Sequence, residues 1–313
     1  MHTTHSFLAL GSILTLLGSA HGYTLMNTYD ATNFFDYFNF FTAVDPTSGY
    51  VDYVSETVAM ADGLARYQNN QVYLGVDYTT SNPASMRASV RVTSDISYTQ
   101  GLFIADIAHM PEAACGVWPA FWMFGPNWPD SGEIDIIEGV NLATTNSITL
   151  HTSAGCTVSN ANSLPGTTTV TSNCNQDNAG TGCQVTTSNT NGYGTGFNTV
   201  GGGVYAMQWA SDGIYVWFFQ RGSIPADITS GYPNTANWGT PTASFSGSGC
   251  NFNTYFANQN IVFDTTFCGT WAGVVWGASS CASYASTCND YVANNPGAFQ
   301  NSYWLINSVK VYQ

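Results

Sequence analysis

The sequence predicts an all-β protein folded as a single β-sandwich. Short runs rich in β-branched and aromatic residues follow one another at intervals of about ten positions, and turn-forming residues separate them. No long helical period competes with this pattern. The chain has 313 residues, an ordinary length for one large all-β domain with a single core.

The predicted strands begin near Leu64 and continue to the end of the chain. Before them, residues 23–53 are crowded with Phe and Tyr but lack good helix formers, so we expect packing residues there. The Thr-, Ser-, Asn- and Gly-rich tract 153–202 is expected to be an elaborate loop stapled by cysteines, not a domain boundary. The clearest strand-like runs are residues 71–78, 89–93, 101–106, 203–209, 213–219, 260–264 and 308–312.

Residues 131–140 (Ser-Gly-Glu-Ile-Asp-Ile-Ile-Glu-Gly-Val) place three carboxylates close together in a chain with only 8% charged residues. The isoleucines between them predict a short, largely buried strand, where a carboxylate is costly unless it is paired, hydrogen-bonded or used. Glu133 and Asp135 share one face of that strand, whereas the odd spacing would send Glu138 to the other. One extra residue in a β-bulge, most simply at Ile136-Ile137, would turn Glu138 back.

Two carboxylates on one wall favour glycoside hydrolysis, in which one group attacks the anomeric carbon and the other protonates the leaving oxygen. On spacing alone, a solvated acidic edge strand and a set of calcium ligands stay open as alternatives. A calcium loop normally alternates acidic residues with Gly and Asn, and this segment alternates them with Ile. That difference counts against the calcium interpretation.

The acidic segment and its surroundings resemble glycoside hydrolase family 16, and more narrowly the secreted fungal laminarinases, which are endo-1,3(4)-β-glucanases. The resemblance rests on Glu-Ile-Asp-Ile-Ile-Glu at 133–138 and on the tryptophan-rich approach at 116–122 and 125–129. It implies a concanavalin-like jelly roll whose concave sheet carries a sugar-binding cleft. Other similar stretches cover nearly all of the remaining chain, at 101–111, 149–152, 201–207, 221–228 and 264–269.

The resemblance also implies a role for each acidic residue and for two basic ones. Glu133 would be the nucleophile, Asp135 would assist it, and Glu138 would be the acid/base. His151 would lie near the acid/base, although a lone histidine is more often a structural group. Arg91 matches the family's cleft arginine, with a plain ion-pair partner as the alternative.

Tryptophan either fills a core or forms a platform on which a sugar ring stacks. Alternation places Trp122 on one face of the run 117–124, together with Trp118, Ala120 and Phe124, and Pro119 within this run favours an edge or irregular strand. We assign three tryptophans to the cleft: Trp122 and Trp128, which approach the acidic strand, and Trp271, which lies in a Cys-Gly-Thr-Trp turn.

Together with the paired carboxylates, the resemblance implies a retaining endo-β-glucanase that hydrolyses internal β-1,3 and β-1,3-1,4 linkages without a cofactor or a catalytic metal. Two alternatives stay open. A cell-wall glucan transglycosylase would let a sugar hydroxyl, instead of water, intercept the glycosyl-enzyme. A lectin-like glucan-binding module would use the same fold without catalysis. A structural calcium near Asp30 or Asp36 is a weaker possibility.

Charge narrows the choice of partner. Five Lys+Arg face nineteen Asp+Glu, which gives a formal charge of −14. That field repels nucleic acid and anionic membranes, so we expect neither as a partner, while a neutral β-glucan is indifferent to it. We expect a monomer.

Residues 1–22 resemble a signal peptide, and residues 23–313 would form a single catalytic domain that is secreted to the extracellular space. The apolar run Phe7–Leu17 is too short for a membrane helix, and Ala20-His-Gly22 supplies small residues for cleavage. The first five residues depart from the usual pattern because they contain no Lys or Arg.

All 8 cysteines follow this leader, and an even number in a secreted chain predicts disulfides. We expect at least three, with a local pair such as Cys281–Cys288 as a plausible loop staple. Zinc is disfavoured because only His109 and His151 follow the leader and no cysteine pair has C-x₂-C spacing.

Overall fold

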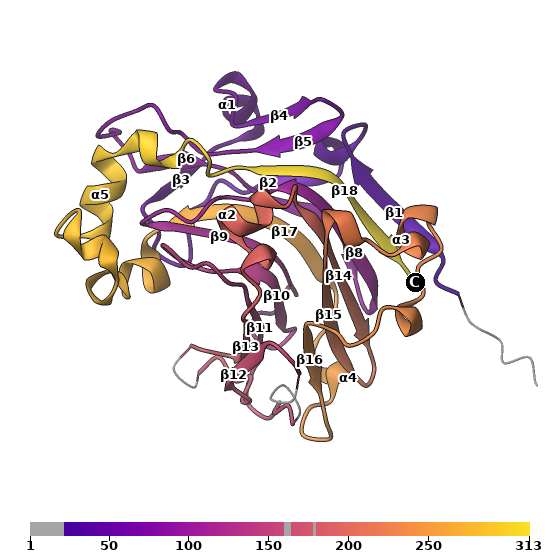
Figure 1. Ribbon diagram of the computed structural model, residues 1–313. Coiled ribbons are helices and arrows are strands. Elements are labelled where there is room, and N and C mark those ends of the chain that lie inside the picture. The colour runs from indigo at the N-terminus through magenta and orange to yellow at the C-terminus, as the bar shows by residue number, and fades with distance from the viewer. Residues whose placement is uncertain (1–21, 160–163, 178–179) are drawn as a thin grey trace, which may run out of the picture.

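The structure is a computed structural model that describes residues 22–159, 164–177 and 180–313. Two eight-stranded antiparallel sheets pack face to face, and a small two-stranded sheet lies beside them (Figure 1). The predicted all-β jelly-roll sandwich is therefore confirmed. The predicted signal peptide lies outside the described residues except for Gly22. No helix in the described part of the chain is long and apolar enough to cross a bilayer.

The first large sheet, which we call the β14 sheet, has the strand order β16-β15-β14-β8-β18-β5-β4, with β1 also paired to β18. Its strands are β1 (Leu25–Asp30), β4 (Ala65–Gln68), β5 (Gln71–Leu74), β8 (Gly101–His109), β14 (Gly203–Ala210), β15 (Gly213–Gln220), β16 (Ala243–Ser246) and β18 (Trp304–Tyr312).

The second large sheet, which we call the β10 sheet, has the order β12-β13-β11-β10-β9-β17-β7-β2. The catalytic segment predicted from the sequence, β10, lies in its middle. Its strands are β2 (Phe38–Phe40), β7 (Arg91–Tyr98), β9 (Val117–Phe124), β10 (Glu133–Glu138), β11 (Ser147–His151), β12 (Thr167–Thr171), β13 (Cys183–Thr187) and β17 (Gln259–Phe267). The small sheet pairs β3 (Val51–Tyr53) with β6 (Arg87–Ser89) in parallel.

Each of the seven strand-like runs predicted from the sequence overlaps an observed strand. The prediction for residues 153–202 is wrong in part, because β12 and β13 lie within this tract and extend the β10 sheet at one edge. β12 reads Thr-Thr-Thr-Val-Thr with alternating partial exposure. An edge strand with so little apolar content gives no clear hydrophobic alternation.

Pro119 does not mark an edge strand. β9 is an interior strand that pairs with both β10 and β17. Proline is tolerated there because the pairing with β10 ends at Ala120, so Pro119 lies beyond the last β9 residue opposite that strand.

The core lies between the two sheets, as strand alternation requires. From the β10 sheet, Ile134 and Ile137 are fully buried, and from the β14 sheet Met207, Trp209 and Val309 pack in the same cluster. The opposite face of β9 and β10 is therefore left for polar and aromatic side chains. This division gives the β10 sheet one apolar face and one face with polar and aromatic side chains.

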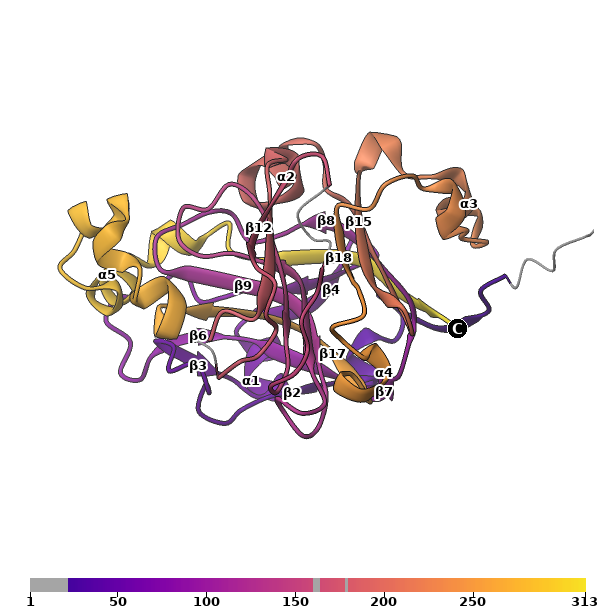
Figure 2. The same cartoon turned by 90° about the horizontal axis from the view of Figure 1, so that it is seen from below.

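Short helices decorate the ends of the sandwich, and α5 lies at the opposite end from α3 in both views (Figures 1 and 2). The α-helices are α1 (Glu56–Ala61), α2 (Gly194–Thr199), α3 (Ala226–Ser230), α4 (Phe252–Tyr255) and α5 (Cys288–Asn294). Single turns of tighter or wider helix are η1 (Phe34–Asp36), η3 (Thr190–Gly192), η4 (Arg221–Ser223), η5 (Thr235–Asn237), η6 (Gly269–Gly273), η7 (Trp276–Ala278), η8 (Ser280–Ser283) and η9 (Pro296–Phe299).

Four disulfides use all eight cysteines, which confirms the expectation of at least three: Cys115–Cys281, Cys156–Cys250, Cys174–Cys183 and Cys268–Cys288. The suggested local pair Cys281–Cys288 is wrong. Cys281 bonds to the segment just before β9, and Cys288 bonds to the residue that follows β17. Both bonds therefore attach the α5 end of the molecule to the β10 sheet, which local pairing would not do.

Candidate active site

The three carboxylates of β10 share one face because the strand contains the predicted bulge. Against β9, Asp135 pairs with Trp122 and Ile137 pairs with Phe121, so Ile136 is an extra residue. Against β11, the same shift lies between Asp135 and Glu138. Both isoleucines of the bulge are buried in the core. Glu138 is thereby returned to the side of Glu133 and Asp135.

Asn146, which directly precedes β11, holds the bulge in place. Its side-chain oxygen accepts from the backbone N–H of Glu138 (2.9 Å), and its side-chain nitrogen donates to the carbonyl of Ile136 (2.8 Å). The residue is fully buried. Because a bulge removes regular ladder partners, this amide satisfies backbone groups on both sides of the extra residue. It also fixes the backbone from which Glu138 projects.

Each glutamate receives a hydrogen bond from an indole. The Nε1–H of Trp128 donates to Oε2 of Glu133 (2.6 Å), and the Nε1–H of Trp118 donates to Oε1 of Glu138 (2.8 Å). Trp118 reaches Glu138 because Ala120 of the same strand pairs directly with Glu138. The two carboxylates are thus oriented by separate donors on separate segments.

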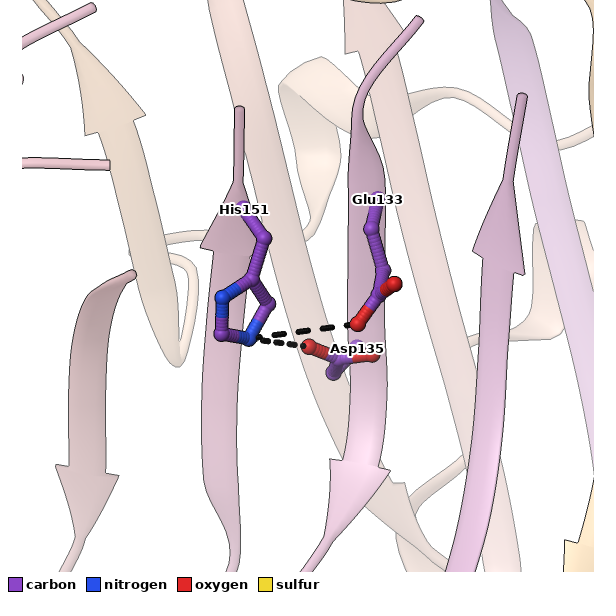
Figure 3. Close-up of side chains that lie close together, drawn as sticks. All are labelled: Glu133, Asp135 and His151. Atoms are coloured by element: carbon purple, nitrogen blue, oxygen red, sulfur yellow. Dashed lines mark ion pairs between the residues drawn. The ribbon is translucent and has the colours of Figure 1, made fainter. Parts of the chain in front are cut away.

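His151 lies opposite Glu133 in the neighbouring strand β11, and its ring points toward both acidic side chains at that end (Figure 3). Its Nε2 is 3.2 Å from Oδ2 of Asp135 and 3.9 Å from Oε1 of Glu133. Burial alone would lower the pKa of His151, but the contact with Asp135 and the charges of Glu133 and Glu138 raise this pKa to about 10. A protonated imidazole therefore stands beside the two acidic residues at neutral pH.

Burial raises the pKa of both glutamates, and the charge of Asp135 adds to the effect. The pKa of Glu133 moves from 4.5 to about 8, with His151, Trp128 and Arg91 opposing the rise. The pKa of Glu138 is raised well above its usual range, with Trp118 and His151 opposing. When two neighbouring carboxyl groups both have raised pKa values, they do not readily ionise together. The state in which one of them keeps its proton is therefore favoured.

A cleft of about 770 Å³ runs over this face of the β10 sheet. It is lined by the three carboxylates and by all five predicted substrate-binding residues: Trp122, Trp128, His151, Arg91 and Trp271. Trp271 meets Trp118 edge to face, with ring centroids 5.6 Å apart. The structure therefore brings every predicted site residue to one cleft. Their roles in catalysis and binding stay predictions.

Arg91 lies on β7, directly opposite Asp264 of β17. It is buried, and its guanidinium carbon is 4.8 Å from the ring centre of Trp122. Burial raises the pKa of Asp264 to about 7 against the opposing effect of Arg91. Asp264 also accepts from Nε1 of Trp122 (3.3 Å). Arg91 and Asp264 therefore support the aromatic floor of the cleft.

Sequence reasoning missed several lining residues. Trp118 could have been found, because alternation already placed it on the face of Trp122. Asp264 could not, since nothing local to it shows that β17 lies beside β9. The same holds for Gln176 and Gln184, which reach the cleft from the tract expected to be a loop.

Glu133, Asp135 and His151 are also the residues that could hold a metal ion. One ligand atom from each lies within 4.8 Å of the other two. A metal would require the unprotonated imidazole, whereas the surrounding acidic groups hold the pKa of His151 at about 10. In the metal-free protein, the three residues form a cluster of facing charges.

Comparison with known proteins supplies a family for this constellation. Residues 38–312 match the model of the XgeA-like catalytic domain of glycoside hydrolase family 16. A probable endo-1,3(4)-β-glucanase of Aspergillus fumigatus is 48% identical over 93% of the chain and 45% of that protein. An endo-1,3(4)-β-glucanase of Arthroderma benhamiae is 44% identical over 100% of the chain and 69% of that protein. The chain thus spans about half the length of several curated relatives it matches.

Two solved structures are similar to this chain over nearly the whole of their own length. An elongating family 16 β-1,3-glucosyltransferase is 45% identical, with a TM-score of 0.87, over 93% of this chain and 100% of that one. Laminarinase 16A of Phanerochaete chrysosporium, solved with β-glucans in donor and acceptor sites, is 41% identical with a TM-score of 0.87, over 93% and 99%. One relative is thus described as a transferase and the other as a laminarinase.

Proposed function

This chain belongs to glycoside hydrolase family 16, and from that membership we propose that it is a secreted endo-β-glucanase that cleaves internal β-1,3 and β-1,3-1,4 linkages with retention of configuration. The observation that carries the proposal is the bulge in strand β10. Because of it, the side chains of Glu133 and Glu138 line one cleft, and each accepts a hydrogen bond from a different indole.

In the first step, a carboxylate oxygen of Glu133 attacks the anomeric carbon. The bond from that carbon to the bridging oxygen breaks, and the oxygen takes the proton of Glu138. A glycosyl ester of Glu133 forms and the leaving sugar departs. Asp135 and protonated His151 hold Glu133 in position, because they lie beside it on the same wall.

In the second step, Glu138 removes a proton from a water molecule, which attacks the anomeric carbon on the face left by the first sugar. The ester bond breaks and Glu133 becomes a carboxylate again. The product carries the original β configuration, because two inversions have taken place. No cofactor enters either step.

Local electrostatics support this division of roles. Glu133 has protonated His151, the Trp128 indole and Arg91 as groups that favour its anion. The pKa of Glu138 stays well above its usual range, which suits a group that must hold a proton before the bond breaks. The wall thus favours Glu133 as nucleophile and Glu138 as acid/base.

Glucan transfer is the second candidate, and one specific observation favours it: a solved structure 45% identical to this chain is described as an elongating β-1,3-glucosyltransferase. Transfer uses the same first step and replaces water by a sugar hydroxyl in the second. A lectin-like module is disfavoured, because binding alone gives no reason to gather one buried and two half-buried carboxylates on one wall.

The four disulfides support an oxidising, extracellular location. The acidic charge of −14 argues against nucleic acid or an anionic membrane as partner and does not disfavour a neutral polysaccharide. We propose a monomer that works on β-glucan without a further subunit.

Product analysis on laminarin and on a mixed-linkage β-glucan tests the proposal. We expect oligosaccharides of intermediate length from the start, as internal cleavage requires, and a first product in the β configuration by NMR. The Glu133→Ala variant should release none. Inverted products, or binding to both polymers without any cleavage, would refute it.

A further inference from the structure

Asn141 is a buried polar residue, just after strand β10, that the proposed reaction does not use. Only 5% of its surface is exposed, and its backbone is in the left-handed region with a φ of +55°. Asparagine is one of the few residues other than glycine that adopt this conformation. A buried side-chain amide is costly unless its oxygen and its nitrogen both have hydrogen-bond partners. The partners of this amide therefore show what the residue holds.

The amide of Asn141 joins two segments that are far apart in the sequence. Its Oδ1 accepts from the backbone N–H of Gly116 (2.8 Å), and its Nδ2 donates to the carbonyl of Ala272 (3.0 Å). The backbone N–H of Asn141 donates to the carbonyl of Val117 (2.9 Å). Gly116 directly precedes β9, and Ala272 lies in η6. Asn141 therefore ties the start of β9 and the turn η6 to the chain that leaves β10.

Both of these segments support one side chain, that of Trp118. Trp118 follows Val117 directly in β9. Its ring meets the ring of Trp271 edge to face, with the centroids 5.6 Å apart, and Trp271 is the residue before Ala272 in η6. Asn141 thus fixes the strand from which the Trp118 indole projects and also the turn against which that indole packs.

The turn η6 is fastened on both sides of Trp271. Cys268, which directly precedes the turn, forms a disulfide with Cys288 of α5. On the other side, Asn141 holds the carbonyl of Ala272. Loss of the Asn141 amide would remove one of these two attachments and leave the disulfide intact. The ring of Trp271 would then be a looser support for Trp118.

We propose that Asn141 is a positioning residue for general acid catalysis: by holding β9 and η6, it keeps the Trp118 indole on the carboxyl group of Glu138. The Nε1–H of Trp118 donates to Oε1 of Glu138 (2.8 Å), so the place of the indole decides how Glu138 is oriented toward the leaving oxygen. This inference rests on the proposed retaining function, in which Glu138 is the acid. Asn141 itself does not line the cleft and acts only through Trp118.

The need for the proton of Glu138 depends on the leaving group. An acidic phenol leaves without protonation, whereas a weakly acidic phenol departs readily only when an acid protonates its oxygen. For aryl glycosides of laminaribiose, kcat/KM reports the formation of the glycosyl ester, in which the phenol is released. The ratio of kcat/KM for the phenyl glycoside to that for the 2,4-dinitrophenyl glycoside therefore measures acid catalysis. Loss of folded protein or of sugar binding cancels from this ratio, because both substrates carry the same sugar.

Asn141→Gly is the variant of choice, because glycine adopts the same left-handed backbone without strain and removes only the amide. Asn33→Gly is the matched control. The Asn33 amide also accepts from one backbone N–H, that of Asp30 (3.0 Å), and donates to one carbonyl, that of Thr28 (2.9 Å), but it lies beside β1 of the other sheet. Trp271→Leu is a second variant that removes the ring support for Trp118, and it decides the question if Asn141→Gly does not fold.

For Asn141→Gly and for Trp271→Leu, we expect the phenyl-to-dinitrophenyl ratio to fall about 3- to 10-fold, the effect of about one hydrogen bond. For Asn141→Gly, kcat/KM on the dinitrophenyl glycoside should stay within about twofold of the unchanged protein. Asn33→Gly should leave the ratio unchanged. In a Trp118→Phe background, Asn141→Gly should lower the ratio no further, because the indole N–H through which it acts is already absent.

An equal loss on both substrates, or an unchanged ratio, would overturn the inference and leave the glucanase proposal intact. A selective loss of the same size in Asn33→Gly, or a full further loss in the Trp118→Phe background, would overturn it in the same way. If the unchanged protein cleaved neither laminarin nor the two aryl glycosides, the glucanase proposal would fail as well.

Discussion

The half-buried glutamates of β10 reduce the stability of the fold at neutral pH, because desolvation raises the pKa of each. The pKa of Glu133 is about 8 in the folded protein against 4.5 as its ordinary value. A raised pKa means that the folded state favours the protonated form. The stability contributed by the protonated form of Glu133 is fully present below pH 4.5 and is lost as the pH rises through about 8. This wall of carboxylates is therefore maintained at the expense of stability.

Replacing this group by a neutral isostere should recover the lost stability. Glu133→Gln should raise the free energy of unfolding at pH 7 by about 1–3 kcal/mol, because folding then no longer requires this group to take up the proton that it has released in the unfolded chain. The corresponding rise in melting temperature is about 2–4 °C per kcal/mol. At pH 4 the gain should nearly vanish. Glu56→Gln, at an exposed position in α1, is the control and should change little at either pH. A gain of equal size at both pH values would contradict the explanation.

The two indoles should act on opposite limbs of the pH–rate profile. The Nε1–H of Trp128 lowers the pKa of Glu133, so Trp128→Phe should move the acidic limb of kcat/KM to higher pH. The Nε1–H of Trp118 lowers the pKa of Glu138, so Trp118→Phe should move the alkaline limb to higher pH. Each variant controls for the other. If both shifted the same limb, the separate roles of the two glutamates would be wrong.

At the scale of residues, the sequence was sufficient to predict that the three carboxylates lie together, and insufficient to predict which other residues line the cleft with them. Glu133, Asp135 and Glu138 are close in the chain, so spacing and strand periodicity place them together. Asp264 and Gln176 lie in separate strands or loops. Their approach to the cleft depends on the order of strands in the β10 sheet, which no local pattern of residues encodes.

At the scale of elements, the bulge in β10 depends on Asn146. Asn146→Asp keeps the acceptor for the Glu138 N–H and removes the donor to the Ile136 carbonyl. We expect a loss of about 1–3 kcal/mol in the free energy of unfolding, since a buried carbonyl loses its partner. We also expect a fall in kcat with little change in KM, because Glu138 is displaced while the sugar-binding walls remain.

Ile148→Val, in the buried face of β11, is a matched control that should lower stability by about 0.5–1.5 kcal/mol and leave the pH profile of kcat unchanged. Asn146→Asp should in addition shift the alkaline limb that reports Glu138. Equal kinetics for the two variants at equal loss of stability would show that Asn146 has only a structural role.

The disulfides should contribute according to the length of chain that they close. Cys174–Cys183 spans 9 positions and Cys115–Cys281 spans 166. In the chain-entropy model, their removal by paired Cys→Ala changes should cost about 3 and about 5 kcal/mol respectively. Denaturant unfolding measures both. A larger loss for the short loop than for the long one would contradict the entropic explanation.

The sequence predicted that disulfides exist and not which cysteines pair. An even number of cysteines behind a predicted signal peptide indicates an oxidising compartment, whereas pairing depends on the three-dimensional position of each residue. Cys281 and Cys288 are near neighbours in the chain, but each is bonded to the end of a different strand. Proximity in sequence was the misleading signal.

At the scale of the whole molecule, alternation in the strands was enough to predict a β-sandwich. The runs that build the centre of both sheets carry strong apolar periodicity, because one of their faces is in the core. The edge strand β12 and its neighbour β13 were missed, since Thr, Ser, Asn and Gly dominate the tract that contains them. Yet Gln184 of β13 and Gln176 from the same tract line the cleft, so the least predictable part of the fold helps to shape the candidate site.

The central claim is that Glu133 is the nucleophile and Glu138 the acid/base of one retaining cleft, and azide rescue tests it most directly. An aryl β-glycoside with an acidic phenol leaves without protonation, so Glu138→Ala should form the glycosyl ester and then stall for want of a general base. Azide should restore turnover and give a glycosyl azide of retained β configuration by NMR. Glu133→Ala should instead give an azide product of inverted α configuration, because azide occupies the space of the missing carboxylate. The reverse pattern, with the β product from Glu133→Ala and the α product from Glu138→Ala, would contradict the assignment of both residues.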